Sequence, residues 1–193
     1  MRRGFIALAS SASLILVALP AQAASQVTVQ DFSFSPTPLS VGQGGSVQWH
    51  NNGPSQHTST SDIGLWSTPP LVASATSTPI TFQAAGVYAY HCKIHPFMQG
   101  KIRVPIKVSP ASGTISTGFT ITLAAAPKTG WSFDVQKKVG PTGLWKIWKT
   151  GVTSLTVPFH HGSAGTWRFR SRLHKNGSTL RVAWSPAKMI TIS

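Results

Sequence analysis

Four side chains in this sequence could act together as ligands of one transition-metal ion. Cys92, His95 and Met98 follow one another at three-residue intervals, and His57 lies upstream in the turn-rich segment 51–58. The set offers a thiolate, two imidazoles and a thioether. Because a long stretch of chain separates His57 from Cys92, only the tertiary fold can assemble such a site.

The types of these donors narrow the choice of metal. A soft thiolate with imidazole partners and a thioether favours copper, and two His, one Cys and a weakly bound axial Met form the arrangement of blue-copper electron-transfer sites. The spacing therefore predicts one type 1 copper ion with His57, Cys92 and His95 in the plane and Met98 as the axial ligand. Zinc is the main alternative because it also accepts two His and a Cys, although structural zinc sites usually recruit a further Cys or His.

One strand and two loops must position these donors. Tyr88, Tyr90 and Cys92 share one face of an alternating run, which predicts that the Cys92 side chain points inward. The His57 segment follows a predicted strand at 46–50. His50 lies on the opposite face of that strand from Trp49, so we expect it to face solvent.

This constellation resembles that of the small blue copper proteins, the cupredoxins. His57 is followed by Tyr-His-Cys-x-x-His-Pro-Phe-Met-x-Gly-Lys at 90–101, and the short loop is similar to that of amicyanin in particular, within a group that includes pseudoazurin and plastocyanin. The resemblance spans about residues 26–108. Thr58 stands where several family members have Asn, which leaves open which hydrogen bond ties the two ligand loops together.

The resemblance implies a surface through which electrons pass. In that interpretation the ring edge of His95, with its apolar neighbours Pro96 and Phe97, is the port at which a redox partner protein docks. Nearby cations could steer an acidic partner. They are Lys93, Lys101 and Arg103.

The chain as a whole has the pattern of an all-β protein. From Gln26 onward, short segments rich in Val, Thr, Phe and Trp are separated by Gly, Pro, Ser and Asn, with no stretch of helical period. We expect a cupredoxin domain at 24–108, which the resemblance implies is a Greek-key β-sandwich, then a linker at 109–113. A second β-sandwich should occupy 114–193, and its segment 165–173 resembles fibronectin type III modules or an immunoglobulin-like relative.

Two details of the first sandwich follow from side-chain parity. Val29 is at an odd position and Phe34 at an even one, so a straight strand would point them to opposite faces. A bend near residues 30–31 would keep Val29, Phe32 and Phe34 all inside the sandwich. Apolar residues alternate with charged ones from Ile102 to Val108, which predicts one continuous, half-buried last strand.

The first residues are typical of a secretory signal peptide. Arg2 and Arg3 precede an apolar stretch at 7–19, and small residues at 21–23 form a cleavage site, so residues 1–23 are excluded from the predicted fold. The paired arginines are compatible with either the general (Sec) or the twin-arginine (Tat) export route. We expect an exported protein, periplasmic or extracellular at the cell surface, without a transmembrane segment in the mature chain. Its single Cys excludes an internal disulfide.

Charge is concentrated in the predicted second domain. The chain has 17 Lys and Arg against 3 acidic residues, and most of the excess lies beyond residue 113. Arg168, Arg170 and Arg172 alternate with apolar residues, so they would line the outer face of a strand. This domain could bind an anionic cell-surface polymer or an acidic protein, or the charge could only aid solubility; nucleic acid is an unfavourable partner for an exported protein.

The remaining histidines are weaker candidates. His91 should point away from the Cys92 face of its strand. His160, His161 and His174 could form a second metal site in the second domain, but loop and surface positions are the simpler interpretation.

These observations favour an exported one-electron carrier that cycles between Cu(I) and Cu(II), with a basic docking or adhesion module. The alternative is copper binding for storage, delivery or sensing without electron transfer. We do not expect an enzyme, because copper enzymes of related fold need further His clusters, for which His160 and His161 alone are a thin substitute.

Overall fold

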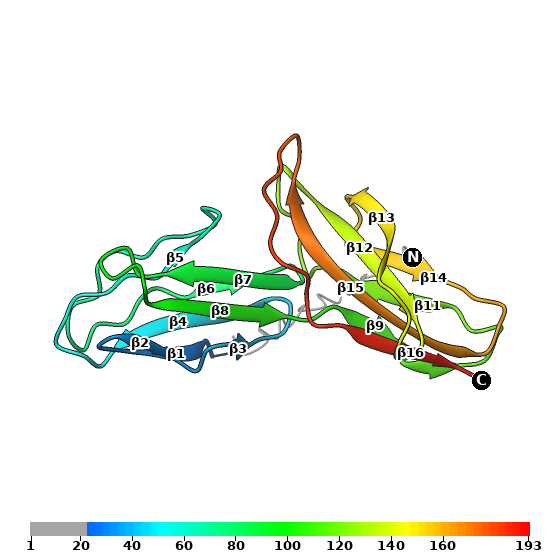
Figure 1. Cartoon of the computed structure of the whole chain (residues 1–193), viewed down its shortest axis with the longest axis horizontal. Helices are drawn as coiled ribbons and strands as arrows, with labels where there is room; N and C mark the ends of the chain where they lie inside the picture. Colours follow the sequence, from blue (N-terminus) through cyan, green and yellow to red (C-terminus); the bar gives the residue numbers. More distant parts are fainter. Residues whose placement is uncertain (1–22) are drawn as a thin grey trace, which may run out of the picture.

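The computed structural model describes residues 23–193, and all its regular elements in that range are β-strands (Figure 1). The predicted signal peptide therefore lies outside the described residues, apart from Ala23. Within this range no helix is long and apolar enough to span a membrane. The strands form two sandwiches, which Figure 1 shows one after the other along the long axis of the molecule. The predicted all-β class is confirmed.

The first sandwich consists of two four-stranded sheets with the orders β2-β1-β4-β6 and β3-β8-β7-β5. The first sheet contains β2 (Ser33–Ser35), β1 (Ser25–Gln30), β4 (Gly45–Asn51) and β6 (Ile80–Phe82). The second contains β3 (Leu39–Ser40), β8 (Gln99–Val104), β7 (Gly86–His91) and β5 (Thr60–Ser61). Two of the pairings are parallel, β1 with β4 and β3 with β8, and the others are antiparallel.

Alternation along the strands builds the core of this sandwich. On β4 and β7 every second side chain is buried, including Val47, Trp49, Tyr88 and Tyr90. The Trp49 and Tyr90 rings meet edge to face between the two sheets, with centroids 5.4 Å apart. Burial of such aromatic side chains contributes much of the apolar stabilisation of a small domain. The same alternation places Cys92 at the buried end of the Tyr88–Tyr90 row.

The second sandwich pairs a three-stranded with a five-stranded sheet, in the orders β14-β11-β9 and β10-β16-β15-β12-β13. The smaller sheet contains β14 (Thr156–Phe159), β11 (Phe119–Thr122) and β9 (Lys107–Ser109). The larger contains β10 (Ser112–Gly113), β16 (Lys188–Ile192), β15 (Gly165–Lys175), β12 (Trp131–Val139) and β13 (Lys146–Val152). Phe159 and Phe169 meet between the sheets at 4.8 Å. The resemblance to fibronectin type III or immunoglobulin-like modules stays a prediction.

The boundary between the sandwiches differs from the expected one. Instead of one strand to Val108, β8 ends at Val104, and residues 107–109 pair with β11 of the second sandwich. Pro105 explains the break, because it has no N–H to continue the ladder. The segment 109–113, expected to be a linker, contributes Ser109 to β9 and Ser112–Gly113 to β10.

The two sandwiches are joined by more than the chain connection. Gln43 reaches across with its side-chain amide, which donates to the carbonyl oxygens of Thr122 at 2.9 Å and Pro105 at 3.2 Å. Backbone hydrogen bonds also cross the junction, namely Ala85 N to Leu123 O, Ala125 N to Gln83 O, Val87 N to Ala183 O and Ala183 N to Val87 O. Regular pairing of this kind restricts motion of one sandwich against the other.

Candidate metal centre

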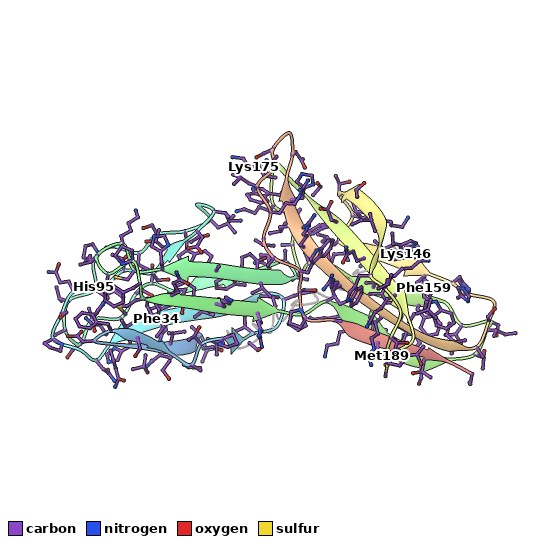
Figure 2. All side chains as sticks on the ribbon, viewed as in Figure 1. Phe34, His95, Lys146, Phe159, Lys175 and Met189 are labelled. Carbon is purple, nitrogen blue, oxygen red and sulfur yellow. The ribbon has the colours of Figure 1, made fainter. Side chains whose placement is uncertain are left out.

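Three of the four predicted ligands converge at one end of the first sandwich. The donor atoms of His57, Cys92 and His95 all lie within 4.8 Å of one another. The His57 and His95 Nδ1 atoms are 3.2 Å apart, and the Cys92 Sγ lies 3.8 Å from the first and 3.9 Å from the second. Figure 2 shows His95 at the end of the molecule farthest from the second sandwich.

A short loop after β7 positions two of these donors and encloses Met98. The Cys92 N–H donates to the Met98 carbonyl at 3.1 Å, and the Met98 N–H donates to the His95 carbonyl at 2.9 Å. These two hydrogen bonds fold the loop tightly enough to bring the Cys92 and His95 side chains to the same point. The Met98 side chain is buried beneath the loop; its role as the axial ligand stays a prediction.

His57 comes from a different loop and is held on both sides. Its backbone pairs with Leu71 through hydrogen bonds of 3.2 and 2.7 Å, and its side chain is fully buried. The His57 Nε2–H donates to Asp31 Oδ1 at 2.7 Å. A carboxylate bound to one ring nitrogen fixes the tautomer and leaves the other nitrogen as a lone-pair donor. The His57 Nδ1 therefore presents a lone pair to Cys92 and His95.

Asp31 is itself fixed by the loop that carries His57. The Ser55 hydroxyl donates to Asp31 Oδ2 at 2.6 Å. This hydrogen bond first, and the contact with His57 second, lower the pKa of Asp31 below its ordinary value. The buried Asn51 side chain braces the same loop, because its amide nitrogen donates to the Ser55 carbonyl at 2.7 Å and to the Leu71 carbonyl at 2.9 Å. The carboxylate therefore stays ionised and correctly placed for the imidazole.

Thr58 ties the two ligand loops together. Its backbone N–H donates to the Cys92 Sγ at 3.3 Å, and its hydroxyl accepts the Lys93 N–H at 2.8 Å. The sequence left this connection open because Thr replaces the Asn of several cupredoxins. The hydroxyl makes the link in its place.

The environment of Cys92 favours the thiolate. Burial by itself raises the pKa of this side chain, but hydrogen bonds to the sulfur from the backbone N–H groups of Thr58, His95 and Ile94 outweigh burial. Together they lower the pKa to about 6 from the ordinary 9.0. The thiolate is the form that binds metal.

The spacing of the three donor atoms suits a metal ion. With metal–nitrogen bonds of about 2.0–2.1 Å and a metal–sulfur bond of about 2.3 Å, a planar trigonal ion has nitrogen–nitrogen and nitrogen–sulfur edges of about 3.6 and 3.8 Å. The observed edges are 3.2, 3.8 and 3.9 Å. One buried thiolate and two imidazoles are also the donor set that copper prefers. The residues present therefore fit a copper ion without rearrangement of the loops.

An apolar surface surrounds the exposed side of His95. Phe32 lies edge-on to the His95 ring at 4.7 Å and to Phe97 at 5.7 Å, and Phe32 and Phe97 are 49% and 71% exposed. Ile94 and Pro96 are exposed beside them. Phe32 was expected inside the sandwich; only Phe34 is buried there, because the chain turns at residues 31–32 before β2 begins. We call Phe32, Ile94, Pro96 and Phe97 the His95 collar.

The other histidines lie apart from this cluster. The His91 Nδ1 is 2.7 Å from the Asp62 carboxylate, and the His50 Nδ1 is 2.7 Å from the Thr76 hydroxyl. His161 packs against Trp167, with ring centroids 4.3 Å apart. His174 lies 3.4 Å from Asp134. Among residues 23–193, His57, Cys92 and His95 form the one group of three or more potential His, Cys or carboxylate ligands.

Comparison with known protein families identifies the family of this chain. A family profile described as Cupredoxin-like domain matches residues 4–104, which is more than half of the chain. The chain belongs to the cupredoxin-like family. A search of curated proteins finds no match.

Several solved structures are similar to this cupredoxin-like chain. A Cu(I) form of an amicyanin mutant is 28% identical and aligns over 44% of this chain and 85% of its own, with a TM-score of 0.40. A reduced Cu(I) form of another amicyanin mutant, at pH 4, is 30% identical over 44% of this chain and 85% of its own, with a TM-score of 0.39. A purple cupredoxin from Nitrosopumilus maritimus is 26% identical over 42% of this chain and 98% of its own, with a TM-score of 0.40.

The sequence did not single out Asp31, Ser55 or Asn51 as parts of the site. Asp31 is one of only 3 acidic residues in the chain, and that scarcity was the available signal. Its pairing with His57 depends on how the turn after β1 meets the His57 loop, and residue spacing carries no information on that meeting.

Proposed function

We propose that this cupredoxin-like protein is an exported one-electron carrier that holds one type 1 copper ion with His57, Cys92, His95 and Met98. The observation that carries the proposal is the buried triangle of one sulfur and two nitrogen atoms, in which Asp31 fixes the tautomer of His57. Copper supplies the one-electron chemistry of the Cu(I)/Cu(II) couple when bound. The proposal includes no catalytic step on a substrate.

The protein contributes a donor set that does not have to move. His57 and Cys92 come from separate loops, and the hydrogen bonds of Thr58 lock these loops to each other. Both loops extend from a sandwich whose core is closely packed around Trp49 and Tyr90. Fixed donors keep the same geometry in both oxidation states, which lowers the structural cost of gaining and losing an electron.

The His95 collar is the surface at which we propose that a redox partner protein docks. Of the three clustered ligands, His95 alone is partly exposed, whereas His57 and Cys92 are fully buried. Exposed aromatic and aliphatic side chains around one ligand form an apolar patch of the kind found at protein interfaces. Lys93 is exposed on the same loop as the collar and would guide a partner that carries acidic groups. Lys101 and Arg103 are exposed on β8, where Arg103 pairs with Val87 at the end of β7 away from that loop.

The signal-like first residues support export to the periplasm or the cell exterior as part of the same proposal. Fractionation of the cells that naturally produce the full sequence tests export, because it shows in which compartment the chain is found. We expect a mature form that begins near Ala24 outside the cytoplasmic membrane. Retention of the full-length chain in the cytoplasm would contradict export without affecting the copper proposal.

The visible absorption spectrum of the purified chain tests the copper proposal. Addition of Cu(II) to the wild type should produce an intense blue thiolate-to-copper band that a mild reductant removes and reoxidation restores. Cys92→Ser should lack the band. His91→Asn changes a neighbouring imidazole on the other face of the strand, so it should keep the band.

Other outcomes would separate the alternatives. A wild type that binds metal but stays colourless would contradict the type 1 site and favour zinc or another copper geometry. A blue protein that passes Cu(I) to an acceptor faster than it exchanges electrons would contradict the carrier proposal and favour copper delivery.

A further inference from the structure

The charged side chains of the second sandwich are almost all positive. Eleven of the 17 Lys and Arg residues lie beyond Ser109, together with a single acidic residue, Asp134. That residue is only 3% exposed. The described surface of this sandwich therefore carries many cationic side chains and essentially no acidic side chain to offset them. A surface that serves only solubility normally mixes positive and negative side chains. A surface with charges of one sign instead attracts an oppositely charged partner.

Part of this charge is organised on the outer face of the larger sheet. Phe169 and Leu173 point into the core, so the alternating Arg168, Arg170 and Arg172 of β15 point outward. The pairing of β12 with β15 places Lys138 directly opposite Arg168. We call the surface around these four cations the arginine face.

Two tryptophans stack between the arginines. The Arg170 Cζ lies 4.2 Å from the Trp145 ring centroid and 5.3 Å from that of Trp184, and the Arg172 Cζ lies 4.2 Å from Trp184. Lys138 Nζ is 5.4 Å from Trp145. Cation–π stacking of this kind holds each guanidinium flat against an indole ring.

Hydrogen bonds on the inner side of each guanidinium complete this order. The Arg170 Nε–H donates to Gln136 Oε1 at 2.8 Å, and the Arg172 Nε–H donates to Asp134 Oδ2 at 3.0 Å. Within residues 23–193, the terminal Nη groups of these two side chains donate to no acceptor. Because the guanidiniums are already ordered, binding of an anion to them costs little further side-chain entropy.

Exposed apolar side chains lie on the same face. In the strand pairing, Met189 is opposite Arg168, and Ile147 is opposite Gln136, which is in turn opposite Arg170. Directly paired residues point to the same side of a sheet. Met189 is 47% and Ile147 is 52% exposed.

We propose that the arginine face, with Ile147 and Met189, binds the surface of a bilayer that contains anionic lipids. Ordered guanidiniums and lysines attract negatively charged headgroups. Exposed aliphatic side chains beside them enter the boundary between headgroups and acyl chains, and Trp is favoured at that depth. The apolar side chains decide between a membrane and a soluble polyanion, because a hydrated polymer offers nothing for Ile147 and Met189 to contact.

The placement leaves the copper site free. Figure 2 shows Met189 on the second sandwich and His95 at the far end of the first. A chain attached to a membrane through the arginine face therefore keeps the His95 collar away from the attachment point. The proposal does not depend on the identity of the bound metal.

Sedimentation with lipid vesicles tests the proposal. The purified chain should bind vesicles that contain phosphatidylglycerol, should bind vesicles of phosphatidylcholine alone far more weakly, and should lose affinity as salt is added. Ile147→Ser should weaken binding about tenfold, because the side chain leaves an apolar environment. The double variant Lys138→Gln/Arg168→Gln should weaken it about fivefold for each charge removed.

Matched variants in the first sandwich serve as controls. Val72→Ser changes an apolar side chain that is 52% exposed there, and Lys101→Gln/Arg103→Gln removes the same number of charges. Both should bind like the wild type, and every variant should show the wild-type circular dichroism spectrum. Equal binding by Ile147→Ser and the wild type, with release by soluble polyphosphate, would overturn the membrane proposal in favour of a polyanion site.

Discussion

At the scale of single residues, two carboxylate–imidazole pairs of the same length provide a test of the metal site. Asp31 lies 2.7 Å from His57, and Asp62 lies 2.7 Å from His91. Only the first imidazole belongs to the donor cluster. We expect Asp31→Asn to weaken metal binding about 10- to 100-fold, because the amide no longer supplies the charge that orients the ring and raises its basicity. Competition with a coloured chelator measures the affinity.

Asp62→Asn is the matched control for this change. It removes the same charge from the same kind of pair on the other face of β7, so the metal affinity should stay at the wild-type value. Equal losses in both variants would show that net charge, and not orientation of His57, sets the affinity.

The pKa of Cys92 gives a prediction for the metal-free protein. Its folded pKa is about 6, below the ordinary 9.0. Below about pH 6 the thiol is protonated in both the folded and the unfolded chain, so it adds no pH-dependent stability. Between these values the unfolded state binds more protons, so the contribution grows as pH rises and is complete above about 9.

Denaturant unfolding at several pH values measures this contribution. The free energy of unfolding of the wild type should rise with pH relative to that of Cys92→Ser across this window, and the gain should be lost again as pH falls through about 6. Absorbance of the thiolate in the ultraviolet follows the same titration directly. A constant difference between the two proteins would contradict a lowered pKa.

The sequence predicted that His57, Cys92 and His95 converge, but it did not predict which residues support them. Cys92, His95 and Met98 lie on one short loop, and their spacing alone predicts that they can converge. His57 could be added because its donor type completes the set. Asp31 could not be predicted as a partner of His57, because an Asp–His contact between two loops depends on the path of both backbones. A carboxylate beside a turn also has many other possible partners.

At the scale of elements, Thr58 determines how the two ligand loops are joined. Its hydroxyl accepts the Lys93 N–H at 2.8 Å. Thr58→Val keeps the shape of the side chain but leaves that N–H without its acceptor. We expect the metal-free protein to lose about 1–3 kcal/mol in free energy of unfolding, the usual cost of an unsatisfied backbone donor. Urea denaturation followed by tryptophan fluorescence measures the loss.

Thr58→Ser is the corresponding control, since it keeps the hydroxyl and removes only a methyl group. It should lose much less stability than Thr58→Val, and metal should still bind it tightly. If both variants lose the same amount, packing of the methyl group and not the hydrogen bond joins the loops.

Alternation predicted most strands, and it failed where one residue changed the backbone. Tyr88 and Tyr90 are buried as expected on β7, and Cys92, directly after its end, continues the buried row. The strand expected to reach Val108 ends early because Pro105 interrupts it, and the residues beyond find a partner in β11. Phe32 is a large apolar residue of the kind usually found in a core, yet it is exposed to solvent. It lies in a turn, where the alternation of a strand does not predict the direction of a side chain.

At the scale of the whole molecule, backbone pairing between the sandwiches predicts that they unfold together. Four backbone hydrogen bonds cross the junction, and Gly86 lies within it. A Cβ at that position would collide with Val182 of the second sandwich. We expect Gly86→Ala to lower the free energy of unfolding by about 1–3 kcal/mol through overpacking. Gly42→Ala is the control, because no atom lies within 4 Å of its added Cβ.

Two probes report on the two sandwiches in the metal-free protein. The Cys92 thiolate reports on the first, and tryptophan fluorescence reports mainly on the second, which contains most of the 7 Trp residues. For the wild type both signals should change at the same denaturant concentration, because coupled units unfold in one transition. Separate midpoints in the wild type would show that the junction is too weak to couple the sandwiches. Coincident midpoints would show that the junction couples the two sandwiches into one cooperative unit.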